Sequence, residues 1–215
     1  MTATRMELVL ASSSPRRHDL IRLMGMPFRV EPSRYEEPPP PDTTVSLPDL
    51  VSELAANKAL EVALRLGVGW VLGADTLVSL DEHIGTPLGK PADSSDARRM
   101  LGLLSGRSHF VYSGIAVVPP WDASGEPRAF RSVTKTRVRF RRLSDDMISD
   151  YVVTGEPLDK AGAYGAQGYA APFIEAFEGD FYNVVGLPLC DLGRLLERCG
   201  LDWRHLRSAG MSSPS

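Results

Sequence analysis

The chain has 215 residues, and its 24 lysine and arginine residues against 27 aspartate and glutamate residues give a formal net charge of −3. Its composition, 43% hydrophobic and 24% charged, is that of a folded domain, and at this length the chain needs no disulfide or metal to stabilise it. The weakly acidic balance argues against a surface that coats nucleic acid or an anionic membrane, but it leaves room for one basic pocket that binds a small anion.

The cysteines and the apolar runs indicate a compartment. Cys190 and Cys199 both fall in the predicted closing helix, about 13 Å apart along its axis, which is beyond disulfide reach. Reduced thiols are typical of the cell interior. There is no apolar run of about 18 residues, and the apolar run near the N-terminus is too short for a signal peptide. A cytoplasmic protein is therefore predicted.

The predicted elements begin with a short buried strand at 7–11, which leads into a serine-rich turn. Ser14 is suited to cap the following helix, Pro15 to its first position and Gly25 to its end. A second strand is predicted at 28–30, and an amphipathic helix at 48–66. Between them lies a long loop with four prolines at 38–41, interpreted as a stiff spacer rather than a protein ligand.

The second half of the chain alternates between long strands and helices. Strands are predicted at 70–80, 109–118, 129–142 and 173–186, and helices at 94–104, 144–153 and 188–199. A glycine-rich loop is expected at 154–172, and a polar, disordered tail at 206–215. These patterns predict a single mixed α/β domain over residues 1–205, because strands this long cannot all be parallel.

The turn after the first strand is the first candidate site. Arg16 and Arg17 lie in the first turn of a helix, the end at which the macrodipole disfavours cations. Two arginines beside three serine hydroxyls and the free amide groups of a helix start are typical of an anion site. The alternative is that both arginines point to solvent. The spacing of a P-loop is absent.

Charged residues in unusual places give further candidates. Asp75 interrupts an apolar strand, so it needs a metal, a catalytic role or a structural salt bridge to offset the cost of burying its charge. Lys58 lies on the polar side of the helix at 48–66, and Lys90 just before a helix; alone, each would be interpreted as a solvated side chain. Glu36 and Glu37 follow the second strand, in a loop from which a carboxylate could reach a metal.

The glycine-rich loop is the last candidate. Residues 155–168 carry four glycines, and small residues allow close approach to a flat ligand. Gln167 offers both a donor and an acceptor, as the recognition of a base edge requires. A flexible surface loop is the alternative reading.

Together these segments resemble the Maf-like nucleotide pyrophosphatases over about residues 7–199. The motifs that carry the resemblance are Gly73-Ala74-Asp75-Thr76 and the segments 10–17, 88–91, 104–106, 154–165, 167–168 and 183–188. The resemblance implies an elongated α/β domain with a mixed central sheet flanked by helices and a cleft between two lobes, similar to the inosine triphosphate pyrophosphatases.

The resemblance also implies an activity: hydrolysis of a nucleoside triphosphate to the monophosphate and pyrophosphate, with Mg²⁺ or Mn²⁺, by a homodimer. The weakly acidic charge predicts no nucleic acid or membrane partner. Arg16, Thr76 and Gln167 match the branches of the family that act on dTTP and UTP. The branch that acts on 7-methyl-GTP typically has an aromatic residue, Gln and Glu at these positions. The Gln167 amide suits thymine or uracil, since it can donate to O4 and accept from N3–H.

The resemblance further implies a division of roles. Asp75 is expected to activate the water that attacks the α-phosphorus, and Glu36 or Glu37 is expected to join Asp75 in binding the metal. Polar and cationic side chains are expected to contact the phosphates or orient the water: Ser12, Arg17, Lys58 and Lys90. The alternative function is a nucleotide-binding regulator of cell division, acting in septum formation, for which turnover is incidental.

Overall fold

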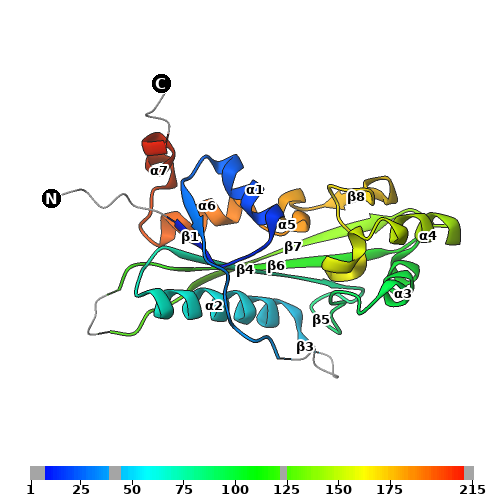
Figure 1. Cartoon of the computed structure of the whole chain (residues 1–215), viewed down its shortest axis with the longest axis horizontal. Helices are drawn as coiled ribbons and strands as arrows, with labels where there is room; N and C mark the ends of the chain where they lie inside the picture. Colours follow the sequence, from blue (N-terminus) through cyan, green and yellow to red (C-terminus); the bar gives the residue numbers. More distant parts are fainter. Residues whose placement is uncertain (1–7, 39–44, 122–124, 211–215) are drawn as a thin grey trace.

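The computed structural model describes residues 8–38, 45–121 and 125–210 (Figure 1). Its strands are β1 (Leu8–Leu10), β2 (Phe28–Val30), β3 (Val45–Ser46), β4 (Val71–Ser79), β5 (Ile84–Gly85), β6 (Ser108–Val118), β7 (Phe130–Phe140) and β8 (Ile174–Glu178). Its α-helices are α1 (Pro15–Met24), α2 (Leu47–Leu66), α3 (Ser94–Leu104), α4 (Asp145–Val153), α5 (Phe181–Val185), α6 (Leu189–Arg198) and α7 (Trp203–Gly210). Three short 3₁₀ turns are η1 (Glu156–Asp159), η2 (Ala161–Ala163) and η3 (Ala171–Phe173).

Strands of both directions form the central sheet, in the order β2-β1-β4-β6-β7-β8. β1 runs parallel to β2 and β4, whereas β4, β6, β7 and β8 pair antiparallel in sequence. β1 pairs with β4 only at Val71 and Leu72. On that side, the next residues of β4 therefore have no neighbouring strand within the described ranges, and this open edge is where the site lies.

Local signals set the ends of α1 as the sequence predicts. Pro15 takes the first helical position, and Gly25 ends the helix with φ of 70°, in the left-handed region that glycine tolerates. Ser14 occupies the N-cap position, but its side chain makes no capping hydrogen bond. Within the serine-rich turn, Ser12 Oγ accepts from the amide of Ser14 at 3.3 Å, so the turn is held by a side-chain hydrogen bond other than a helix cap.

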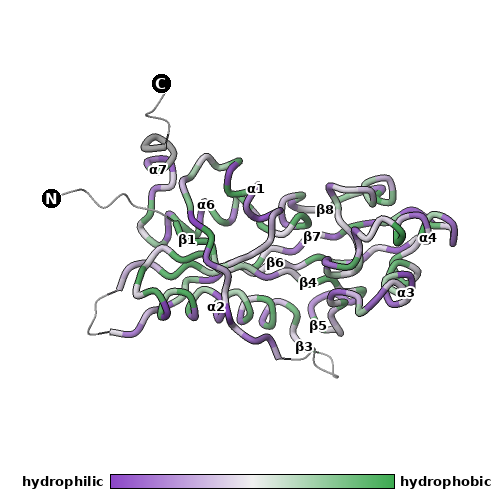
Figure 2. The backbone as a smooth tube through the Cα atoms, in the orientation of Figure 1, coloured by the Kyte–Doolittle hydropathy of each residue, from purple (hydrophilic) through white to green (hydrophobic). Residues whose placement is uncertain are grey.

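Helix α2 lies directly on the sheet because two facing positions are glycine. A Cβ at Gly73 would lie 2.2 Å from the carbonyl oxygen of Ala55, and one at Gly114 would lie 2.3 Å from that of Val51. Asp75 shares a strand face with Gly73, so it also faces α2. Figure 1 shows α2 along one side of the sheet, and Figure 2 shows its turns alternating between hydrophobic and hydrophilic residues, as an amphipathic helix requires.

The two ends of the elongated sheet carry separate cores (Figure 1). One core packs α1 and α6 against β1 and includes Leu8, Ile21 and Leu192. The other packs α3 and α4 against the far ends of β6 and β7 and includes Leu101 and Phe140. This arrangement confirms the expected mixed α/β fold.

One predicted strand is wrong. The segment 173–186 is not one strand: β8 ends at Glu178, and Asp180 then caps α5 by accepting from the amides of Tyr182 and Asn183. At the other end of the chain, α7 runs to Gly210 and the side chain of Leu206 is buried against the first core, whereas residues 211–215 of the expected tail lie outside the described residues. Residues 39–41 of the proline run lie outside the described residues. None of the helices in the described ranges is long and apolar enough to cross a bilayer.

Candidate active site

A cavity of about 750 Å³ lies at the open edge of β4. Its walls come from the turn between β1 and α1, from α2 and β4, and from the glycine-rich segment around η1 and η2. Because this edge of β4 lacks a neighbouring strand, Asp75 from one face and Thr76 from the other both border the cavity. A cavity of this size, lined by several convergent polar groups, is typical of a small-molecule site.

Arg17 is held in a fixed orientation at the start of α1. Its Nε donates to the carbonyl oxygen of Gly186 at 2.9 Å, and its two terminal nitrogens donate to Ser12 Oγ at 3.2 Å and Thr76 Oγ1 at 3.1 Å. Burial lowers the pKa of the guanidinium, and the nearby Asp75 carboxylate opposes this shift. The alternative that Arg17 points to solvent is wrong: its planar fork is pre-oriented at the cavity wall.

Lys58 and two carboxylates form the opposite part of the site. Lys58 Nζ contacts Asp75 Oδ1 and Glu37 Oε1, each at 2.6 Å. The side chains of Lys58 and Asp75 are only 14% and 12% exposed, so their ion pair is poorly screened. The salt bridge that the sequence left open as an alternative for Asp75 is therefore present, and it lies inside the cavity.

The wall contributed by the glycine-rich segment carries more charge than the sequence predicted. Arg16 lies 3.5 Å from the carboxylate of Asp159, and Lys160 Nζ donates to the other oxygen of that carboxylate at 2.6 Å. Both Asp159 and Lys160 line the cavity, and neither received a role from the sequence. The signal that could have found them is their place in the specific motif 154–165.

Thr76 is part of a chain of hydroxyls behind Arg17. Ser113 Oγ donates to the carbonyl oxygen of Asn183 at 3.0 Å and lies 2.9 Å from Thr76 Oγ1. Since the single Ser113 proton is directed to Asn183, the Thr76 hydroxyl donates to Ser113 and offers only acceptor positions on its other side. Ser113 and Asn183 are thus supporting residues that sequence reasoning missed, because they come from β6 and α5.

The structure brings nearly all the predicted site residues to this one cavity. Nine of them line it: Ser12, Arg16, Arg17, Glu37, Lys58, Asp75, Thr76, Lys90 and Gln167. Lys90 and Gln167 are exposed on its rim. Glu36 does not line the cavity and its side chain is exposed, so of the two adjacent glutamates only Glu37 is brought to the site.

The donor set suits a hard divalent cation that the substrate helps to bind. Within the described ranges, no cluster of three or more His, Cys, Asp or Glu residues could hold a metal alone. Asp75 and Glu37 do converge, since both touch the same lysine ammonium. Mg²⁺ in nucleotide enzymes is commonly bound by one or two carboxylates and the phosphates of the substrate, so these residues fit it.

Comparisons with known proteins identify relatives of this chain. A family profile described as Maf-like protein matches residues 7–199. A dTTP/UTP pyrophosphatase of Moorella thermoacetica is 48% identical over 200 residues, covering 91% of this chain and 96% of the relative. The dTTP/UTP pyrophosphatases of Dictyoglomus thermophilum and Bacillus cereus are 43% and 40% identical, covering 90% and 93% of this chain and 96% and 98% of the relatives. The chain belongs to the Maf-like protein family.

Proposed function

We propose that this chain hydrolyses dTTP and UTP to the nucleoside monophosphates and pyrophosphate. The observation that carries the proposal is the pairing of Asp75 with Lys58 in the cavity that the fixed guanidinium of Arg17 also lines. Relatives that are 40–48% identical over nearly their whole length carry the name dTTP/UTP pyrophosphatase, which supports this reaction.

The reaction needs a base, an electrophile and charge compensation. The Asp75 carboxylate accepts a proton from a water molecule while the oxygen of that water bonds to the α-phosphorus. The bond between the α-phosphorus and the oxygen that bridges to the β-phosphorus breaks, and pyrophosphate leaves with that oxygen. Arg17, Lys58 and Lys90 offset the negative charge that grows on the leaving group. Ser12, which already accepts from Arg17, donates its hydroxyl proton to a phosphate oxygen.

A divalent cation, Mg²⁺ or Mn²⁺, belongs to the same proposal. Asp75 and Glu37 would hold it together with the substrate phosphates. When bound, it supplies electrostatic stabilisation of the phosphate charge. A homodimer, which the family resemblance implies, also remains part of the proposal. So does the cytoplasmic location predicted from the cysteines and the apolar runs; the free thiols of Cys190 and Cys199 suit a reducing compartment.

The products provide the test of the reaction. Incubation with dTTP or UTP and Mg²⁺ is expected to release one pyrophosphate per nucleotide and no inorganic phosphate, when the two are detected separately. Chelation of the metal with EDTA is expected to stop the release, and added Mg²⁺ to restore it. Release of inorganic phosphate would contradict the assignment of the α-phosphorus. Tight nucleotide binding without turnover would instead favour the regulator of septum formation.

The base is proposed to be selected by Arg16, Thr76 and Gln167, which all line the same cavity. Thr76 contributes as an acceptor only, because its proton is directed to Ser113. Gln167 is the one of the three whose substitution tests the idea most directly, since its amide can both donate to O4 and accept from N3–H of a pyrimidine.

Replacing Gln167 by glutamate is expected to lower kcat/KM for UTP by about ten-fold, because a carboxylate repels O4. The amino group at the 4-position of cytosine donates instead, so CTP is expected to lose less or to gain. The ratio of kcat/KM for UTP and CTP is the measurement. An unchanged ratio would remove Gln167 from base selection.

A further inference from the structure

The side chain proposed to recognise the base is that of Gln167, and what fixes its position is the backbone around it. No hydrogen bond to any residue of the described ranges holds the Gln167 side chain, and the residue is exposed at the cavity rim. Its position is therefore set by the backbone of the short segment 165–169. The conformation of that segment depends in turn on the hydrogen bonds made at its two ends.

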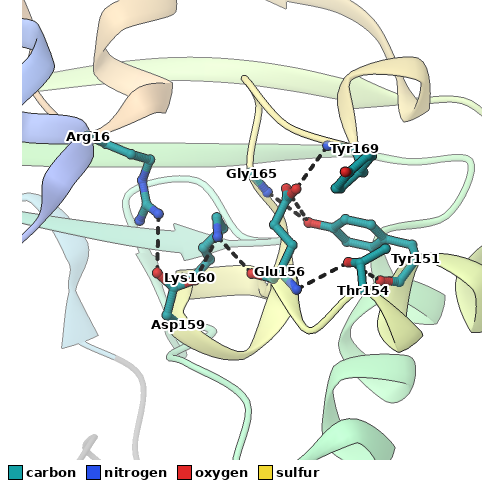
Figure 3. A network of polar contacts seen from close by, with 8 residues as sticks. All are labelled: Arg16, Tyr151, Thr154, Glu156, Asp159, Lys160, Gly165 and Tyr169. Carbon is teal, nitrogen blue, oxygen red and sulfur yellow. Dashed lines mark hydrogen bonds and ion pairs between the residues drawn. The ribbon is translucent and has the colours of Figure 1, made fainter.

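One carboxylate, that of Glu156, is tied to both ends of this segment (Figure 3). Glu156 Oε2 accepts from the amide of Tyr169 at 3.0 Å. Glu156 Oε1 accepts from the hydroxyl of Tyr151 at 3.0 Å, and that hydroxyl oxygen accepts from the amide of Gly165 at 3.1 Å. Glu156 thus fixes the C-terminal end of the segment directly and its N-terminal end through Tyr151.

The protonation of Tyr151 fixes the direction of these hydrogen bonds. Burial raises the pKa of the Tyr151 phenol, and the nearby Glu156 carboxylate acts in the same direction. The phenol is therefore neutral at ordinary pH, and its single O–H donates a hydrogen bond to Glu156. Its lone pairs are then free to accept from Gly165.

Two glycines let the carboxylate lie directly on the segment. A Cβ at Gly168 would lie 2.3 Å from both carboxylate oxygens of Glu156, and one at Gly165 would lie 2.8 Å from Oε1. No side chain fits in either place without displacing Glu156. The sequence between 165 and 168 is thus matched to this contact and not only to flexibility.

The backbone of Glu156 is itself anchored from the cavity side. Lys160 Nζ donates to the carbonyl oxygen of Glu156 at 2.7 Å and also contacts Asp159, which faces Arg16. On the other side, the Glu156 amide donates to Thr154 Oγ1 at 3.2 Å. The carboxylate therefore projects from a braced turn.

We propose that Glu156 is a positioning residue for base selection: by tying both ends of the segment 165–169, its carboxylate holds Gln167 at the cavity rim. This inference rests on the proposed role of Gln167 in reading a pyrimidine. Glu156 touches neither the phosphates nor the attacking water in this scheme. Its loss therefore affects recognition of the base more than the chemical step.

The test compares Glu156→Ala with Glu156→Gln. The alanine variant is expected to raise KM for UTP and to lower the UTP/CTP ratio of kcat/KM by about ten-fold, with kcat changed less than three-fold, because two tethers are lost. In Glu156→Gln, the amide oxygen can still accept from the Tyr169 amide, and the amide nitrogen can donate to the Tyr151 hydroxyl oxygen. This variant is therefore expected to restore the ratio to within about three-fold of the parent chain. The matched control is Glu178→Ala, which removes an exposed glutamate on β8 that pairs with Arg137 on β7. It is expected to leave the ratio unchanged.

A second pair of variants disturbs the contact without altering Glu156. Gly168→Ala is expected to reproduce the loss of selectivity, since its Cβ would overlap the carboxylate. Gly102→Ala, which places a methyl group in open space on α3, is expected to have no effect. Thermal melting of each variant shows whether the whole fold is affected. A uniform loss of kcat for all nucleotides with a lowered melting temperature would mean a merely structural role and would overturn the inference.

The Gln167→Ala background separates this inference from the proposed function. If Glu156 acts through Gln167, Glu156→Ala adds no further loss of selectivity in that background. If Gln167→Ala alone leaves selectivity intact, the proposed base-reading role fails first. If Gln167→Ala reduces selectivity but Glu156→Ala does not, only the positioning role of Glu156 is wrong.

Discussion

Replacing Asp75 by asparagine is expected to lower kcat for dTTP and UTP by about 10²–10⁴-fold. Asparagine has nearly the same shape but cannot accept a proton from water and is a poor ligand for a divalent cation. The carboxylate also balances Lys58, whose Nζ lies 2.6 Å from it, so the free energy of unfolding is expected to fall by about 1–3 kcal/mol. Steady-state release of pyrophosphate measures the first effect, and thermal melting the second.

The control for this substitution is Asp19→Asn. Asp19 is an exposed aspartate on α1 that pairs with Arg22 outside the cavity. The activity and the stability of the Asp19→Asn variant are therefore expected to differ little from those of the parent chain. If Asp75→Asn stays folded and retains most of the rate, Asp75 is not the base. In that case its ion pair with Lys58 has only a structural role.

The sequence anticipated the residues of this site better than their contacts. Asp75 was conspicuous because a charge within an apolar strand needs a partner, and that partner is Lys58 on α2. No local pattern reveals this pairing. It depends on Gly73 and Gly114, which let α2 approach the sheet closely enough for the lysine to meet the carboxylate.

The helix α1 and the strand at 173–186 show why the predicted fold was right in one place and wrong in another. The ends of α1 are encoded locally, by Pro15 at its start and Gly25 at its end. The pattern of apolar and acidic residues after Phe173 also favours a strand, but Gly179 adopts φ of 128° and Asp180 then caps a new helix. A turn of two residues between two segments rich in aromatic and β-branched residues gives a weaker signal than those segments do.

The glycine-rich segment illustrates a contact that composition conceals. Four glycines suggested flexibility or close approach to a ligand, and both readings concern the loop alone. Two of them instead make room for Glu156, whose carboxylate lies against Gly165 and Gly168. The hydrogen bond between Glu156 and Tyr169 joins residues 13 positions apart, so only the folded chain reveals it.

Replacing Arg17 by alanine is expected to lower kcat by about 10²–10³-fold, because it removes the fixed cation that is proposed to offset charge developing on the phosphates. Lysine at the same position keeps the charge but cannot reproduce a planar fork that bonds Gly186, Ser12 and Thr76 together. The kcat of Arg17→Lys is therefore expected to exceed that of Arg17→Ala by no more than about ten-fold.

The comparison between lysine and alanine at this position distinguishes two roles of Arg17. If only its charge matters, lysine restores nearly the full rate. If its geometry matters, lysine fails, and Ser113→Ala, which removes the support behind Thr76, lowers kcat in the same direction but by less. Arg22→Lys on the exposed side of α1 is the matched control, since its partner Asp19 lies outside the cavity and a lysine can pair with it equally well. A full rate in Arg17→Lys would mean that the three hydrogen bonds serve the fold, and that a point charge at the start of α1 is all the reaction requires.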